Sequence, residues 1–133
     1  MNREPPKPPR PDLVRRPTGA FGWLDARLLR DDWLSRLGAE ACTVLAFLAL
    51  AADHQGASWW GRDRMARALS IPRPALDRAL KRLVELQLVA HRPWNPKHVD
   101  GVWQLLPVPT PRLTRTNSLT DLATIVRQLG FKP

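Results

Sequence analysis

The fold can be predicted from residues 58–92, SWWGRDRMARALSIPRPALDRALKRLVELQLVAHR. Its apolar residues recur at helical spacing on both sides of a turn at residues 70–72, and charged residues fill the positions between them. The pattern predicts a short extended piece at residues 58–60 and a helix over 61–69, with the glycine at its start serving as the N-cap. A second helix is expected to follow the turn and to end near Gln87.

The second of these helices is expected to begin at Pro74. A proline disfavours the helical conformation of the residue before it, here Arg73, which is therefore placed in the entry turn. Pro72, at the usual capping position, has no polar side chain with which to cap the helix. The inward face of this helix is an apolar line made of Leu76, Leu80 and Leu83, with Ala79 and Val84 beside it.

Further elements are expected on both sides of this stretch. Upstream, the spacing predicts a short helix over 27–37, ended by Gly38, and an apolar helix over 39–54 that should lie at the centre of the core. Downstream, strands over 88–92 and 102–106 should form a β-hairpin with a long tip, PWNPKHVDG.

The chain divides into four parts by composition. Residues 1–19 are a basic, proline-rich arm that we expect to be disordered. They are followed by one domain over 20–106, a linker over 107–117 and a last helix over 118–133. The stripe of that helix either packs back on its own domain or pairs with a second copy, and we expect a homodimer through residues 118–133. The stripe consists of Leu119, Leu122, Val126 and Leu129.

The order helix, short strand, helix, turn, helix, hairpin is that of a winged helix. The chain resembles the helix-turn-helix domains of plasmid replication initiators and of small regulators of bacterial mobile elements, over about residues 38–106. The fold class expected is mainly α with a small β-hairpin, a winged helix-turn-helix plus a C-terminal helix. The residues that carry the resemblance are Trp59, the runs 64–69 and 78–83, Ile71, Leu76, Leu86, Leu88 and Val89.

The charge of the chain is concentrated in the same region. The net charge is +9 and the isoelectric point is about 11.4. Nine basic but only three acidic side chains fall within residues 61–97. A localised surplus of this kind favours a polyanionic partner, and with the resemblance it implies a sequence-specific regulator that binds double-stranded DNA, in control of transcription or replication.

In the fold that the chain resembles, the second helix of the pair lies in the major groove and the helix before it braces the backbone. Arg73 and Arg78 are candidates for bidentate contacts with guanine. Asp77 could accept a hydrogen bond from cytosine, pair with Lys81, or mark a domain that has lost specific reading. The complete set of candidate DNA-binding residues is Arg62, Arg64, Arg67, Arg73, Asp77, Arg78, Lys81, Arg82, Arg92, Lys97 and His98.

No catalytic motif, metal site or cofactor site is expected. The three histidines, His54, His91 and His98, are scattered without neighbouring ligands, and Cys42 is the single cysteine, so we expect a buried, inert thiol. The longest apolar run, over 41–52, is too short to span a bilayer, and the first residues do not form a signal peptide. The sequence therefore predicts a non-enzymatic, cytoplasmic protein.

An alternative function stays open. Asp77, Pro72 and Pro74 weaken the case for base reading, and a winged helix can also be a protein-interaction module that scaffolds a larger protein or ribonucleoprotein assembly. Trp59 and Trp60 are either a stacking platform or, as we expect, one core indole and one partly exposed indole.

Overall fold

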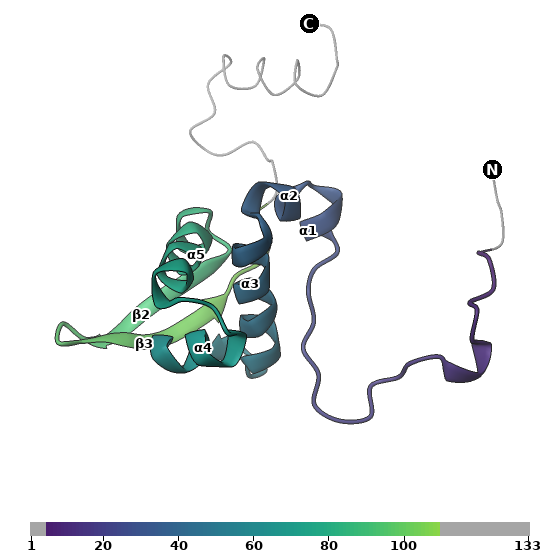
Figure 1. The fold of residues 1–133 in the computed structure, drawn as a ribbon, viewed down its shortest axis with the longest axis horizontal. Coiled ribbons are helices and arrows are strands. Elements are labelled where there is room, and N and C mark those ends of the chain that lie inside the picture. The colour runs from purple at the N-terminus through teal and green to yellow at the C-terminus, as the bar shows by residue number, and fades with distance from the viewer. Residues whose placement is uncertain (1–4, 110–133) are drawn as a thin grey trace, which may run out of the picture.

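A computed structural model describes residues 5–109 of the chain (Figure 1). Most of the linker and the whole of the helix predicted over 118–133 lie outside the described residues. The described residues form helices packed with a small three-stranded antiparallel sheet, which confirms the expected combination of helices with a small β-structure. The elements are the 3₁₀ turn η1 (Pro11–Leu13), α1 (Arg27–Arg30), α2 (Trp33–Leu37), α3 (Ala39–Ala51), β1 (Ala57–Ser58), α4 (Arg62–Leu69), α5 (Arg73–Glu85), β2 (Val89–Asn95) and β3 (His98–Leu105).

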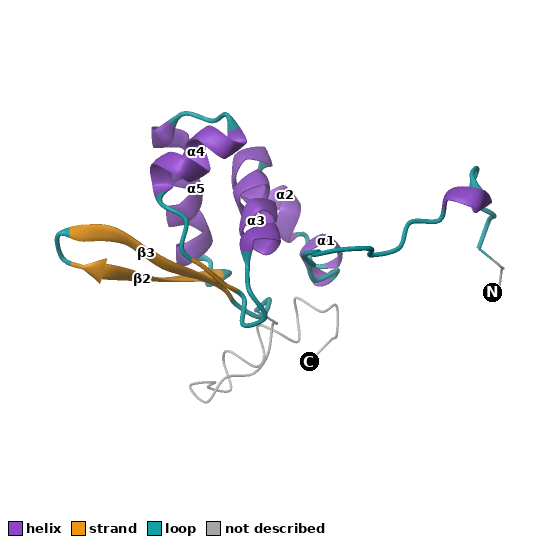
Figure 2. Cartoon of the chain, turned by 90° about the horizontal axis from the view of Figure 1, so that it is seen from below, coloured by secondary structure: helices purple, strands orange, loops and turns teal. Residues whose placement is uncertain are grey.

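Helix α3 lies at the centre of the fold, as its nearly uniform apolar character predicts. It packs beside α4 and α5 and against the sheet (Figure 2). The expected end at residue 54 is wrong, because the helix stops at Ala51. The carboxylate of Asp53 accepts hydrogen bonds from the backbone N–H groups of Gln55 (2.8 Å) and Ala57 (3.0 Å). Such a side-chain turn competes with helix continuation and directs the chain into β1.

The single helix predicted over 27–37 is also wrong, since two short helices, α1 and α2, occupy this stretch. Asp32 between them adopts a left-handed backbone conformation with φ of 62°. Aspartate is one of the few residues other than glycine that visits this region, and the break turns Trp33 into the core. Gly38, with φ of 83°, ends α2 as expected.

Helix α5 begins at Arg73, one residue before the start predicted at Pro74. Pro72 is extended, and its carbonyl accepts the N–H of Leu76 at 3.0 Å. Pro74 fits the first turn, where a backbone N–H has no helical partner in any case. Arg73 is helical despite the proline that follows, and its guanidinium contacts the carboxylates of Asp63 in α4 and of Asp77 one turn further along α5.

The sheet has the strand order β1-β3-β2, and all its neighbours are antiparallel. The hairpin strands are longer than predicted, so most of the expected loop over 93–101 is wrong and only residues 96–97 separate β2 from β3. Pro93 pairs with Gly101, where an added Cβ would overlap the Arg92 carbonyl. The loop-forming residues of this stretch therefore accommodate a close, irregular ladder rather than interrupt it.

The core joins the helices to the sheet. Phe47 of α3 meets Trp60 edge-on, with ring centroids 4.9 Å apart, whereas Trp59 is 61% exposed. The expectation of one core indole and one partly exposed indole is confirmed. The largest fully buried side chains are Met65, Leu76, Leu83, Leu88, Val44 and Val89. None of the helices over residues 5–109 has the length and apolarity that crossing a membrane requires.

Candidate nucleic-acid interface

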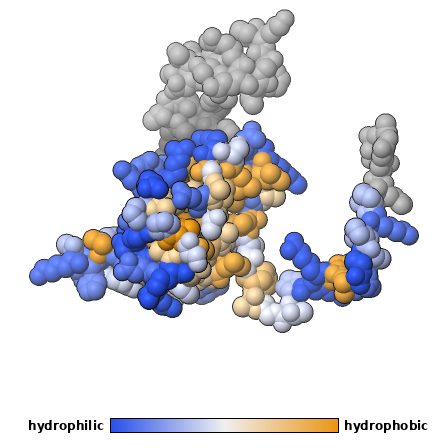
Figure 3. All heavy atoms as spheres, viewed as in Figure 1, coloured by the Kyte–Doolittle hydropathy of each residue, from blue (hydrophilic) through white to orange (hydrophobic). Residues whose placement is uncertain are grey.

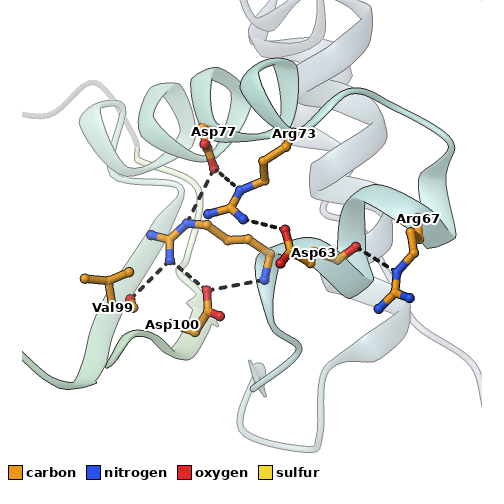
Figure 4. Close-up of polar contacts among 7 residues, drawn as sticks. Asp63, Arg67, Arg73, Asp77, Val99 and Asp100 are labelled. Atoms are coloured by element: carbon orange, nitrogen blue, oxygen red, sulfur yellow. Dashed lines mark hydrogen bonds and ion pairs between the residues drawn. The ribbon is translucent and has the colours of Figure 1, made fainter. Parts of the chain in front are cut away.

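A network of acidic and basic side chains joins α4, α5 and β3 (Figure 4). Its centre is Arg62, whose Nη1 donates to Asp100 Oδ1 at 2.8 Å and to the Val99 carbonyl at 3.1 Å. Its Nε lies 3.6 Å from Asp77 Oδ1. The guanidinium also lies 4.8 Å from the ring centroid of Trp103, and the side chain is only 16% exposed. Arg62 therefore ties the first turn of α4 to the hairpin.

Arg73 extends the network to the start of α5. Its Nη1 lies 2.6 Å from Asp63 Oδ1, and its Nε donates to Asp77 Oδ1 at 2.9 Å. The hydrogen bond to Asp77 is the main cause that raises the pKa of Arg73 above its usual value. The guanidinium predicted to read guanine is thus already bound by two carboxylates. Of the alternatives for Asp77, local pairing with Lys81 is wrong, because Asp77 pairs with Arg62 and Arg73 instead.

The later turns of α5 carry cations that are held only loosely. Arg78 lies 4.0 Å from Glu40 and is 70% exposed, and Lys81 lies 4.0 Å from Glu85. Arg82 donates to the carbonyl of Arg36 at 3.2 Å. These three cations are spaced by three and four residues, which places them on one face of the helix. The face is available to a partner because no short ion pair engages it among the described residues.

The two remaining arginines of α4 are also exposed. The guanidinium of Arg64 lies 4.2 Å from the ring centroid of Trp60, and Nε of Arg67 donates to the Asp63 carbonyl at 3.4 Å. A cation over an aromatic ring keeps its charge and its outward hydrogen bonds. Both side chains can therefore still meet a phosphate.

The hairpin brings Lys97 and His98 to its tip, where the Asn95 side chain accepts both of their backbone N–H groups at 2.9 Å. Arg92 is separated from the other candidates. It neighbours His91, which stacks on Trp103 toward α5, and successive strand residues point to opposite faces. Arg92 thus lies on the sheet face that points away from α5.

A groove of about 570 Å³ lies between α5 and the hairpin. Lys81, Val84 and Glu85 line it from the helix, and His91 and Trp103 line it from the sheet. In Figure 3 the surface over α5 and the hairpin is mostly hydrophilic, whereas apolar surface gathers toward α1 and α3. The lining of the groove carries three basic side chains, Arg62, Arg73 and Lys81, and two acidic ones, Asp77 and Glu85.

Sequence reasoning missed Asp63, Asp100 and Trp103 as parts of this site. The pair Arg73 and Asp77 could have been found, because residues four apart on a helix are neighbours. Asp100 lies 38 residues from Arg62 in the sequence, so their contact is seen only in the folded structure, where the hairpin lies next to the start of α4.

Among the residues that the structure describes, no group of three or more histidine, cysteine or acidic side chains is placed to hold a metal ion. Cys42 is half-buried rather than fully buried as predicted, and its Sγ lies 3.4 Å from the Leu34 carbonyl. Burial raises the pKa of this thiol, which keeps it in the unreactive protonated form.

Comparison of the chain with models of protein families, with curated protein sequences and with solved structures finds no match in any of the three.

Proposed function

We propose that residues 20–106 form a winged helix-turn-helix domain that binds double-stranded DNA. Helix α5 is the groove-entering helix, α4 is the bracing helix, and the β2–β3 hairpin is the wing. Two features support this assignment. The elements follow in the order α3, β1, α4, α5, β2, β3, and β1 pairs with the far strand of the hairpin to close the sheet order β1-β3-β2.

The observation that carries the proposal is the division of the basic residues into two groups. Arg62 and Arg73 are bound by Asp63, Asp77 and Asp100, and so fix α4, α5 and the hairpin relative to one another. The second group stays exposed on those same three elements: Arg64, Arg67, Arg78, Lys81, Arg82 and Lys97. A rigid frame that presents several cations is what binding to a phosphate backbone requires, because little ordering entropy remains to be lost.

Each group then has its own role on DNA. Arg78, one turn into α5, is the candidate for reading a base edge, and Lys81 and Arg82 further along contact phosphates. Arg64, Arg67 and Lys97 add phosphate contacts from the two flanking elements. Arg62 and Arg73 act as positioning residues. The protein is thereby proposed to be a sequence-specific regulator of transcription or replication.

A salt titration tests the binding. If roughly six to eight phosphates are engaged, the logarithm of the association constant should fall with the logarithm of salt concentration with a slope of about −5 to −7. Selection of bound duplexes from a random pool should in addition enrich one motif. Absence of binding at low salt, or binding that does not respond to salt, would refute the proposal.

One observation favours a second candidate. Three carboxylates lie within the basic surface, and the side chain of Asp63 is 80% exposed. Acidic groups at such a place repel phosphate and suit a protein partner that carries cations of its own. A winged-helix module that scaffolds a protein or ribonucleoprotein assembly would therefore bind duplexes weakly, and the random pool would enrich no motif.

A further inference from the structure

A second hollow, of about 670 Å³, shares no lining residue with the groove beside α5. Its walls come from residues 21–28, from the second half of α3 and from residues 104–108, where β3 ends. Buried apolar side chains such as Leu28, Leu45 and Leu88 form much of its lining. The cavity is therefore mainly apolar and is large enough to take several side chains.

Large apolar side chains lie exposed at this pocket. Phe21 is 70% and Trp23 is 74% exposed, and both line it. Gly22, between them, lies so close to α3 that a Cβ at this position would overlap the carbonyl of Ala49. Two large exposed apolar side chains that line one pocket form a surface suited to an apolar segment.

We propose that residues 118–133 of the same chain cover this pocket. The chain itself leads there, since Val108 lines the pocket one residue before the last described residue, Pro109. The nine residues from there to Ser118 can span about 30 Å when extended, which is enough to reach any part of the pocket's mouth.

The chemistry of the segment matches that of the pocket. Leu119, Leu122, Val126 and Leu129 recur at helical spacing and form one apolar stripe. Charge is complementary as well. Residues 110–133 carry four basic side chains and one acidic, whereas residues 21–60 carry three basic and five acidic. Asp25 and Asp53 are the two of those acids that line the pocket, beside one basic side chain, Arg27, so the segment meets an apolar floor with a slight excess of acidic groups.

The segment of the same chain is favoured over that of a second copy. The stripe could in principle dimerise, but two molecules that each carry a net charge of +9 repel each other. A tether of nine residues gives the segment an effective concentration in the millimolar range at its own pocket. This inference does not depend on DNA binding, so it can fail or hold separately from the proposed function.

Disulfide trapping in the full-length chain tests the proposal. In a Cys42→Ser background, Ala52→Cys places a thiol at the pocket and Ala123→Cys places one beside the stripe. The control pair is Lys97→Cys with Ala123→Cys, because Lys97 lies at the hairpin tip while the opposite end of β3 lines the pocket. Under mild oxidation at low protein concentration, the first pair should form a monomeric disulfide at least fivefold faster than the control.

Other results of the trapping would overturn the proposal. Equal rates for the two pairs would mean that the segment has no preferred place on the domain. Disulfide-linked dimers from the first pair would mean that the segment of a second copy occupies the pocket.

A dye-binding measurement tests the same contact without cysteines. Leu122→Asp places a charge in the apolar stripe, and Thr124→Asp places the same charge on the opposite side of a helix. The first variant should uncover the pocket and raise the fluorescence of an added apolar dye severalfold, while the second should leave it unchanged. Equal fluorescence for both variants and the unaltered chain would contradict the proposal.

Discussion

The imidazole of His91 lies flat on the indole of Trp103, with ring centroids 3.7 Å apart and ring planes 10° from parallel. This pair forms the sheet side of the groove that faces α5. Burial is the main cause that lowers the pKa of His91 below its ordinary 6.5, and the positive charge of Arg62 adds to it. Protonation of His91 would place a second cation beside Arg62, which already uses Asp100 as its partner.

The first prediction concerns this histidine. The unfolded chain protonates the imidazole near pH 6.5 and the folded chain only at lower pH, so the unfolded state binds more protons between the two values. The free energy of unfolding should therefore fall as the pH is lowered from about 6.5 toward 5. His91→Gln should flatten that dependence in urea titrations at several pH values, whereas His98→Gln at the exposed hairpin tip should preserve it. An unchanged dependence in His91→Gln would assign it to other groups.

The second prediction concerns Arg62. Arg62→Gln removes the contacts with Asp100, Asp77 and the Trp103 ring, and it leaves partly buried groups unpaired. The free energy of unfolding should fall by about 1–3 kcal/mol, measured by urea denaturation.

Arg64→Gln is the matched control, because Arg64 also lies over an indole but is exposed and has no carboxylate partner among the described residues. It should change stability by less than about 0.5 kcal/mol. Equal effects of the two substitutions would show that the network does not hold the hairpin to α4.

The sequence predicts those parts of the arrangement that depend on residues close together in the chain, and it misses those that depend on residues far apart or on a single backbone conformation. The helical spacing of Leu76, Leu80 and Leu83 is local, and it correctly gives α5 and its buried face. The break at Asp32 depends on one left-handed residue, and no periodicity signals it. The sequence predicts a long loop over residues 93–101 at the tip of the hairpin because Pro93 and Gly101 are loop formers in isolation, and only their pairing across the ladder makes them strand residues.

In the candidate site, too, the sequence predicts the local features and misses the contacts between residues far apart in the chain. The exposed cations of α5 could be read from the helix periodicity alone. The engagement of Arg62 by Asp100 could not be read, since a sequence shows charges but not which of them the fold neutralises. The expected roles of Arg62 and Arg73 in DNA contact therefore change to positioning roles in the proposal, while that of Arg78 stays as it was.

The third prediction concerns Asp77. If phosphate approaches α5, the carboxylate of Asp77 repels it and also occupies Arg73. Asp77→Asn keeps the shape, removes the charge and leaves Arg73 freer, so affinity for duplex DNA at low salt should rise about threefold, or roughly 0.7 kcal/mol. Fluorescence anisotropy on a labelled duplex measures the change. Asp53→Asn, at the other pocket, should leave affinity unaltered, and a lower affinity in Asp77→Asn would contradict the expected repulsion.

The last prediction separates base reading from phosphate contact. Arg78 is exposed on a helix whose other face is fixed in the core by Leu76, Leu80 and Leu83, so its side chain starts from a rigid backbone. Lys97 lies at the hairpin tip and offers charge with little geometric precision. Arg78→Ala should cost about 1–3 kcal/mol on the preferred duplex and relax preference at one base position. Lys97→Ala should weaken all duplexes alike and lower the salt slope by about one.

Both variants should keep the melting temperature of the unaltered chain, because neither side chain is buried, and any loss of affinity can then be assigned to the interface. Binding of each variant to the selected and to a scrambled duplex completes the comparison. If Arg78→Ala weakens both duplexes equally, α5 does not read sequence through this residue. If it weakens neither, α5 does not face the DNA, and the observation that acidic groups lie within the basic surface then favours a protein partner instead.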